Sequence, residues 1–160
     1  MKKPQKPKTV IVRDSREQMP FLFCSFGEEV DVIVRGLKAG DYSLDGYENQ
    51  IAIERKSIGD LYGSLTRDRE RFEKEFQRLA DYEFSAVVVE SPWSHVCNPS
   101  HYDRYWRSKV SPSSIIGSIL SWSIKYPTKW FLCPDRLFAE RTTLRLLQHF
   151  LRIKEERGQQ

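Results

Sequence analysis

The sequence predicts an α/β domain with a mixed central sheet, in which antiparallel hairpins come first, strand-helix-strand units follow, and helices flank the sheet. Two observations support this fold class. Short strand-like stretches fill the first third of the chain, and stretches with helical spacing alternate with strands afterwards. With 160 residues, of which 39% are hydrophobic and 30% charged, the chain also has the size and composition of one folded domain.

We expect a flexible basic arm over residues 1–8, a single domain over 9–154 and a disordered tail over 155–160. The net charge of +4 and the pI of about 9.0 favour polyanionic partners. Three widely spaced cysteines favour a reducing compartment. No apolar stretch reaches the roughly 18 to 20 residues that span a bilayer. We therefore expect an intracellular protein, cytoplasmic or nucleoid/nuclear, with no membrane partner.

Four strand segments are predicted before the first helix, over residues 9–13, 30–35, 41–44 and 51–56. The last two form a hairpin with two possible registers. A loop over residues 45–50 places Asp41 directly opposite Glu54. A tight turn at Asp45-Gly46 would place Asp41 opposite Gln50 instead.

Helical spacing dominates the rest of the chain. Ser57 and Asp60 fit a capping box that opens one long helix or two short ones, ending near Leu79. The segments expected after it are a buried strand over 84–90, a loop over 91–111, a core helix over 115–124, a strand over 129–133 and an amphipathic helix over 137–151.

The strand over 51–56 carries the residues with the clearest chemistry. Its period of two puts Glu54 and Lys56 on one face and Arg55 on the other. If Asp41 pairs with Glu54, two carboxylates lie about 5 Å apart and can hold one divalent ion. Carboxylates without nearby His or Cys favour Mg²⁺, with Mn²⁺ as a substitute. Such a site suits phosphodiester hydrolysis, with Lys56 near the scissile phosphate or orienting the attacking water.

Four motifs occur in an order that carries a family resemblance: Asp14-Ser15-Arg16-Glu17, Gly40-Asp41-Tyr42, Glu54-Arg55-Lys56-Ser57-Ile58-Gly59-Asp60-Leu61 and Arg71-Phe72. The segment from about Val10 to Leu79, and more loosely to about Leu151, resembles the nuclease domain of the XPF/Hef structure-specific endonuclease family. The resemblance implies a restriction-endonuclease-like core, here in a stand-alone form without a helix-hairpin-helix module.

The resemblance also implies roles for individual residues. Those that carry or support catalysis would be Asp41, Glu54, Arg55, Lys56 and Asp60, and the metal ligands would be Asp41, Glu54, Asp14 and Glu17. For DNA binding we expect Arg16, Arg67 and Arg71, together with Tyr105, Trp106, Arg107 and Lys109, which interleave aromatic and basic side chains as base stacking and phosphate contact require.

Several of these residues also fit a purely structural role. Asp60 completes a capping box without any catalytic task. Arg55 can form a salt bridge to Glu17 or Asp14 as readily as contact a phosphate. Asp14 can cap a turn, and Glu17 can be a solvated surface acid.

The proposed DNA-binding residues have alternatives as well. Arg71 can belong to a solvated helix face with Arg67, Arg69 and Lys74. The aromatic residues of the 91–111 segment can anchor a long loop to the core. Both interpretations remain open from the sequence.

Together these features favour a metal-dependent DNA endonuclease, acting on branched, flap or fork DNA as the family resemblance implies. The alternatives are a non-catalytic module that binds DNA or a partner nuclease, and a sequence-specific restriction nuclease. The intact set of Asp41, Glu54 and Lys56 favours the first. Expected partners are DNA, a second copy bound through the C-terminal helix, and a targeting protein.

Overall fold

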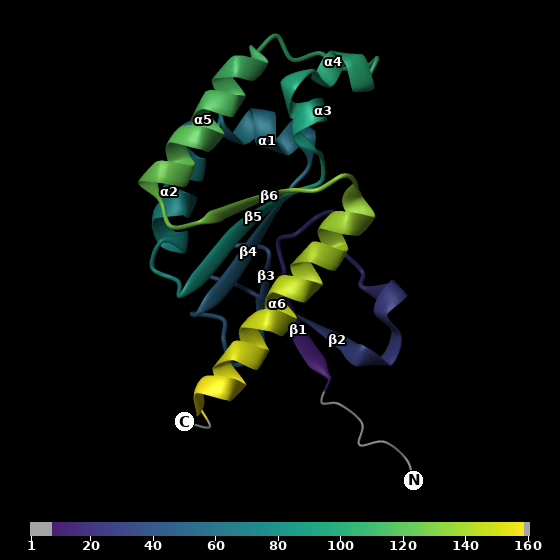
Figure 1. Ribbon diagram of the computed structural model, residues 1–160, viewed down its shortest axis with the longest axis vertical. Helices are drawn as coiled ribbons and strands as arrows, with labels where there is room; N and C mark the ends of the chain where they lie inside the picture. Colours follow the sequence, from purple (N-terminus) through teal and green to yellow (C-terminus); the bar gives the residue numbers. More distant parts are fainter. Residues whose placement is uncertain (1–7, 159–160) are drawn as a thin grey trace.

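The computed structural model describes residues 8–158, with the side chain of Glu28 left out, and shows a six-stranded mixed sheet between helices (Figure 1). The strand order is β2-β1-β3-β4-β5-β6. Short β3 runs antiparallel to both β1 and β4, and the remaining pairs are parallel. The strands are β1 Thr9–Asp14, β2 Val30–Arg35, β3 Tyr42–Leu44, β4 Ile51–Lys56, β5 Phe84–Val89 and β6 Lys129–Leu132. The predicted fold class is confirmed.

Within residues 8–158, seven helical segments connect and cover the strands: the 3-10 helix η1 Cys24–Glu29, and α1 Ile58–Ser64, α2 Arg69–Leu79, α3 Trp93–Cys97, α4 Pro99–Tyr102, α5 Pro112–Lys125 and α6 Arg136–Gly158. The helical pattern after Ser57 therefore forms two helices. None of the helices in the described part of the chain is long and apolar enough to cross a membrane.

Two sequence expectations about irregular segments need correction. The predicted loop over 91–111 contains α3 and α4, which are too short to show a helical period in the sequence. The predicted disordered tail is also wrong over residues 155–158, because α6 continues to Gly158. Near its end, Lys154 Nζ and Arg157 NH1 lie 2.5 and 3.1 Å from the Glu83 carboxylate. The expected arm lies outside the described residues except for Lys8.

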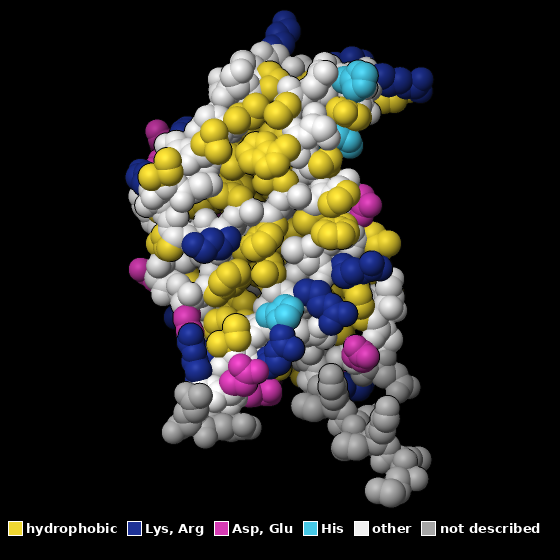
Figure 2. Space-filling model, in the orientation of Figure 1, with side chains coloured by type: hydrophobic (Ala, Val, Ile, Leu, Met, Phe, Trp, Pro, Cys, Tyr) yellow, Lys and Arg dark blue, Asp and Glu magenta, His cyan; other side chains and the backbone are white. Residues whose placement is uncertain are grey.

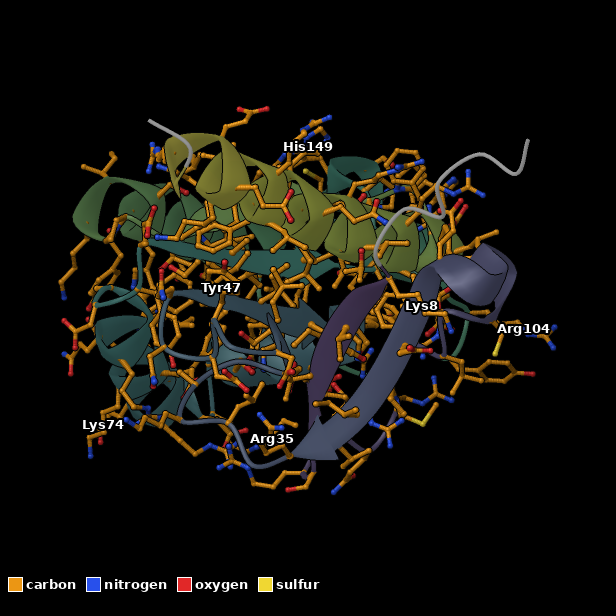
Figure 3. The ribbon with its side chains drawn as sticks, turned by 90° about the horizontal axis from the view of Figure 1, so that it is seen from below. Lys8, Arg35, Tyr47, Lys74, Arg104 and His149 are labelled. Atoms are coloured by element: carbon orange, nitrogen blue, oxygen red, sulfur yellow. The ribbon has the colours of Figure 1, made fainter. Side chains whose placement is uncertain are left out.

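The sheet buries one face under α6 and the other under α1, α2 and α5. The alternation along β4 decides this, because Ile51 and Ile53 pack with Leu144 and Leu147 of α6, whereas Ala52 lies in a separate cluster with Leu79. Figure 3, seen from below, shows α6 above the sheet with His149 pointing away from it, and Lys74 pointing outward from α2 on the other side. Glu54 and Lys56 thus face the α1/α2 side.

Gly40 is required by the turn that leads into β3. Its φ of +73° lies in the left-handed region, and a Cβ atom there would lie 3.1 Å from the carbonyl oxygen of Ile53 and 3.2 Å from the Cβ of Ala52. The turn can therefore hold its position against β4 only without a side chain. Gly40 immediately precedes Asp41, so the same turn sets where that carboxylate lies.

Gly40→Ala is expected to lower the free energy of unfolding by about 1–3 kcal/mol, because it adds both backbone strain and a steric clash. Gly117→Ala, on the exposed face of α5 with open space around it, should raise it by about 0.5–1 kcal/mol through helix propensity. Urea denaturation of the two variants checks these opposite signs. Equal effects would contradict the role of the Gly40 turn.

Candidate active site

The pairing of β3 with β4 brings Asp41 and Glu54 face to face. Tyr42 pairs with Ile53, which places Asp41 directly opposite Glu54. The Asp41 N–H donates to the Ile53 carbonyl at 2.8 Å, and the Asp41 carbonyl accepts from the Asp14 N–H at 2.8 Å. The register with a loop over 45–50 is confirmed, and the register with a tight Asp45-Gly46 turn is wrong.

The two acids open into a polar cleft of about 540 Å³ at the carboxyl end of β4. Nine residues named from the sequence line it: Asp14, Arg16, Glu17, Asp41, Glu54, Arg55, Lys56, Asp60 and Arg71. Arg67 and the segment from Tyr105 to Lys109 are not among its walls. The structure thus brings together most of the predicted site.

The electrostatics of Asp41 and Glu54 oppose their ionisation. Burial raises the pKa of Asp41 well above its ordinary value, and repulsion from Glu54 raises it further. Burial likewise raises the pKa of Glu54, although the Lys56 ammonium works in the opposite direction. A bound cation would therefore stabilise the ionised forms of both carboxylates.

Lys56 supplies a fixed positive charge at this site. Its Nζ lies 2.7 Å from Glu54 Oε1 and 4.6 Å from the centre of the Phe72 ring. Burial alone would lower the pKa of Lys56, but attraction to the Glu54 carboxylate and the hydrogen bond to it raise the pKa overall. Lys56 therefore carries its proton at neutral pH and acts as a cation.

Arg55 points to the other face of the sheet and holds strand ends together. Its guanidinium is buried, with Nε 3.2 Å from Glu17 Oε2 and NH1 2.8 Å from Glu90 Oε1. The salt bridge to Glu17 is confirmed, and the one suggested to Asp14 does not form. The Arg55 backbone N–H also donates to Asp41 Oδ2 at 2.7 Å, which fixes the orientation of that carboxylate.

Asp14 and Glu17 have structural hydrogen bonds that a metal ion would have to replace. The Asp14 carboxylate accepts four: from the Arg16 backbone, Nε and NH2 groups and from the Leu37 N–H. Burial opposes its ionisation, but these bonds outweigh burial and lower the pKa of Asp14. Glu17 accepts from Arg55 and from the Met19 N–H at 2.7 Å. We therefore keep only Asp41 and Glu54 as candidate ligands.

The predicted capping box of Ser57 and Asp60 forms only in part: Ser57 caps α1, but the Asp60 carboxylate accepts from the Ser57 hydroxyl and not from its backbone N–H. The Asp60 N–H donates to Ser57 Oγ at 3.1 Å, and the Ser57 hydroxyl donates to Asp60 Oδ2 at 2.7 Å. The same carboxylate faces the cleft and lies 3.9 Å from Arg55 NH2. Ser57 thus opens α1, while the charge of Asp60 remains beside the site.

Sequence reasoning missed Glu75 and Arg78, which line the cleft from α2. Glu75 Oε1 accepts the Gly40 N–H at 2.9 Å, which ties α2 to the turn before Asp41. Their spacing from Arg71 by four and seven residues places all three on one helix face, a signal available in the sequence. Arg69, which the sequence grouped with Arg71, points away from the cleft. Its NH1 group donates to Ser118 Oγ of α5 at 2.7 Å.

The predicted DNA-binding residues fall into two groups. Arg16, Arg67 and Arg71 are exposed and lie on or near the cleft rim. Trp106 is half-buried, with its ring centre 4.8 Å from that of Tyr62, so it anchors the 91–111 segment to α1. The remaining members, Tyr105, Arg107 and Lys109, are exposed.

Comparison with known proteins places this fold and site in a family. Residues 13–139 match the model of the ERCC4 domain. This chain belongs to the ERCC4 domain family. The match includes all four motifs noted in the sequence and confirms the resemblance to the XPF/Hef family. No curated protein sequence matches the chain significantly.

Solved structures agree with the fold of this ERCC4 domain. It superposes on XPF from Aeropyrum pernix with a TM-score of 0.67 and 24% identity, over 94% of this chain and 70% of that one. For XPF from Aeropyrum pernix in complex with DNA the TM-score is 0.62 at 24% identity, over 93% and 66% of the two chains.

Asp41→Asn is expected to stabilise the protein in the absence of metal by about 0.5–2 kcal/mol near pH 7, because it removes a buried charge and keeps an acceptor for the Arg55 N–H. Because its pKa is raised, Asp41 is neutral at low pH in the wild-type protein. The protein loses stability as the pH rises and Asp41 ionises. The gain should therefore shrink towards pH 4. Denaturation at both pH values in EDTA checks this, and a pH-independent gain would contradict it.

Proposed function

We propose that this ERCC4 domain is a metal-dependent DNA endonuclease that hydrolyses phosphodiester bonds. The observation that carries the proposal is the pair of carboxylates, Asp41 and Glu54, held opposite each other beside the protonated Lys56 in an open polar cleft. This combination of oxygen ligands and positive charge suits metal-dependent phosphodiester hydrolysis.

The donor set fits Mg²⁺, with Mn²⁺ as a substitute. Among the described residues, Asp41 Oδ1 and Glu54 Oε2 have no hydrogen-bond partner, so each acid has one oxygen available. No group of three or more His, Cys, Asp or Glu side chains in that part of the chain is arranged to hold a metal ion. Two carboxylates suit Mg²⁺, because this ion keeps several waters and binds substrate phosphates. When bound, Mg²⁺ supplies a Lewis acid and lowers the pKa of a bound water.

The remaining residues of the site act on the phosphate and on the geometry. Lys56 offsets negative charge on the scissile phosphate. Arg16, Arg71 and Arg78 place guanidinium groups around the cleft, where they can hold flanking phosphates. Arg55 keeps Asp41 oriented through its backbone N–H.

DNA is the proposed substrate, and branched, flap or fork DNA its proposed form. The solved structure of XPF from Aeropyrum pernix in complex with DNA supports DNA as the ligand of this fold. The guanidinium groups of Arg16, Arg71 and Arg78 at the cleft support a phosphate backbone as the bound group, although each is also paired with an acid of the protein.

Glu54→Gln is expected to lower the cleavage rate by a factor on the order of 100 or more, because it removes one of two ligand carboxylates without changing its size. The measurement is cleavage of end-labelled flap, fork and junction DNA with Mg²⁺, resolved on a denaturing gel. EDTA should abolish the wild-type activity.

Glu29→Gln makes the same chemical change at an exposed residue outside the cleft and should cut at the wild-type rate. Binding without cleavage by the wild-type protein, across all three substrates and with Mg²⁺ or Mn²⁺, would favour the non-catalytic alternative and refute the proposal.

We also propose that the domain forms a homodimer through α5, β6 and α6. Figure 2 shows hydrophobic side chains gathered over these elements on one face. On α5, Ile124 is 89% exposed and Leu120 54%, and on α6, Ile153 is 44% exposed. Between them lies β6, the edge strand, whose Trp130, Phe131 and Leu132 are only half-buried. A contiguous apolar surface of this kind is typical of a protein interface.

Ile124→Glu should raise the dimer dissociation constant at least about tenfold, because it places an unpaired charge in the interface. Light scattering over a concentration series measures this. Ser25→Glu adds the same charge on exposed η1 and should leave association unchanged. A wild-type protein that stays monomeric at high concentration would contradict the dimer.

A further inference from the structure

A basic ridge runs along the outer face of α6, on the side of the sheet away from the cleft. We define it by Arg141, Arg145, His149 and Arg152, all of which are exposed. Steps of four, four and three residues keep these side chains on one face of a helix. Figure 2 shows basic side chains and a histidine following one another along α6. The opposite face of the helix packs on the sheet through Leu144, Leu147 and Phe150.

The arginines of this ridge are not neutralised by neighbouring acids. Arg136 and Arg157, at the two ends of α6, pair with Glu90 and Glu83. In contrast, Arg141, Arg145 and Arg152 form no ion pair with any described carboxylate. Arg145 NH1 donates to Gln148 Oε1 at 3.1 Å, and Arg152 contacts the His149 ring.

The acids of the same helix do not compensate for this charge. The Glu140 carboxylate turns inward and accepts the Phe23 N–H. Glu155 and Glu156 follow Arg152 by three and four residues, on the same side of the helix, but neither forms an ion pair with a described arginine of the ridge. Like charges four residues apart repel one another, so the ridge attracts an external anion.

Arginine matches phosphate particularly well, because its guanidinium donates two parallel hydrogen bonds. From Arg141 to Arg152 the helix rises about 16 Å. One DNA strand presents a phosphate about every 3.4 Å of duplex axis, so the ridge can follow several successive phosphates. A nucleic-acid backbone therefore fits both its charge and its length.

The ridge and the cleft lie on opposite sides of the sheet. On one face of β4, Ile51 and Ile53 pack against α6. The cleft lies on the other face, where Glu54 and Lys56 point towards α1 and α2. The sheet and α6 separate the two surfaces. Two arms that diverge from a branch point can lie on opposite sides of the sheet, which one straight duplex cannot do.

We propose that the α6 ridge binds the phosphate backbone of a second arm of a branched DNA whose first arm occupies the cleft. This rests on the proposed function for the first arm and extends it, since it gives a physical reason for preferring branched over linear DNA. The ridge contributes affinity through charge and reads no base sequence.

The test compares wild type with a variant that carries Arg141→Ala, Arg145→Ala and Arg152→Ala together. Affinities for a labelled fork and for a linear duplex of equal length are measured by fluorescence anisotropy in EDTA, over a series of salt concentrations. For the fork we expect a loss of about tenfold or more and a fall of about two to three in the slope of log affinity against log salt. For the linear duplex the loss should stay within about twofold.

A charge-matched control removes three cations that the protein pairs with its own acids, through Lys8→Ala, Arg35→Ala and Lys125→Ala. This control should bind the fork with a loss of no more than about twofold. Circular dichroism and light scattering establish that both variants keep the fold and the oligomeric state of the wild type.

Three results would overturn the proposal. The fork affinity could remain unchanged, the fork and the duplex could lose affinity equally, or the ridge variant could change the oligomeric state, which would assign the surface to a protein contact. Because binding is measured without cleavage, a protein that discriminates forks through the ridge but never cuts them would refute only the nuclease proposal.

Discussion

The antiparallel register of β3 against β4 is the constraint on which the rest of the site depends. A shift by one residue would turn Asp41 to the α6 side of the sheet and separate it from Glu54. The structure secures the register at the turn before β3, where Gly40 adopts a left-handed conformation and donates to Glu75. It secures it again at Asp41, whose backbone and carboxylate both bond to β4.

Around that pairing the protein concentrates acids that repel each other and balances them with two cations of different function. Lys56 shares the face of Glu54 and adds positive charge inside the cleft. Arg55, one residue earlier, reaches the other face and joins Glu17 to Glu90 at the strand ends. The period of two in a single strand thus separates a residue suited to phosphate from one that maintains the architecture.

The positive charge of the chain is distributed over both faces of the sheet. Arg16, Arg71 and Arg78 border the cleft, each paired with an acid, and on the other side of the sheet the α6 ridge presents arginines that have no acidic partner among the described residues. A net charge of +4 does not reveal this division, because many cations are neutralised by nearby acids. What matters for a polyanion is which cations remain without a partner.

Local patterns in the sequence determined the fold class, the faces of β4, the Ser57 cap of α1 and the candidate set of Asp41, Glu54 and Lys56, because these depend on residues close together in the chain. Only the tertiary structure selected between the two hairpin registers, joined Asp14 to Leu37 and Glu17 to Arg55, anchored Trp106 on Tyr62 and tied Glu75 to the Gly40 turn. Those contacts join residues far apart in sequence, such as Glu17 with Arg55 and Gly40 with Glu75, separated by 38 and 35 positions. No local period encodes them, since they arise only when the packed sheet brings its strand ends together.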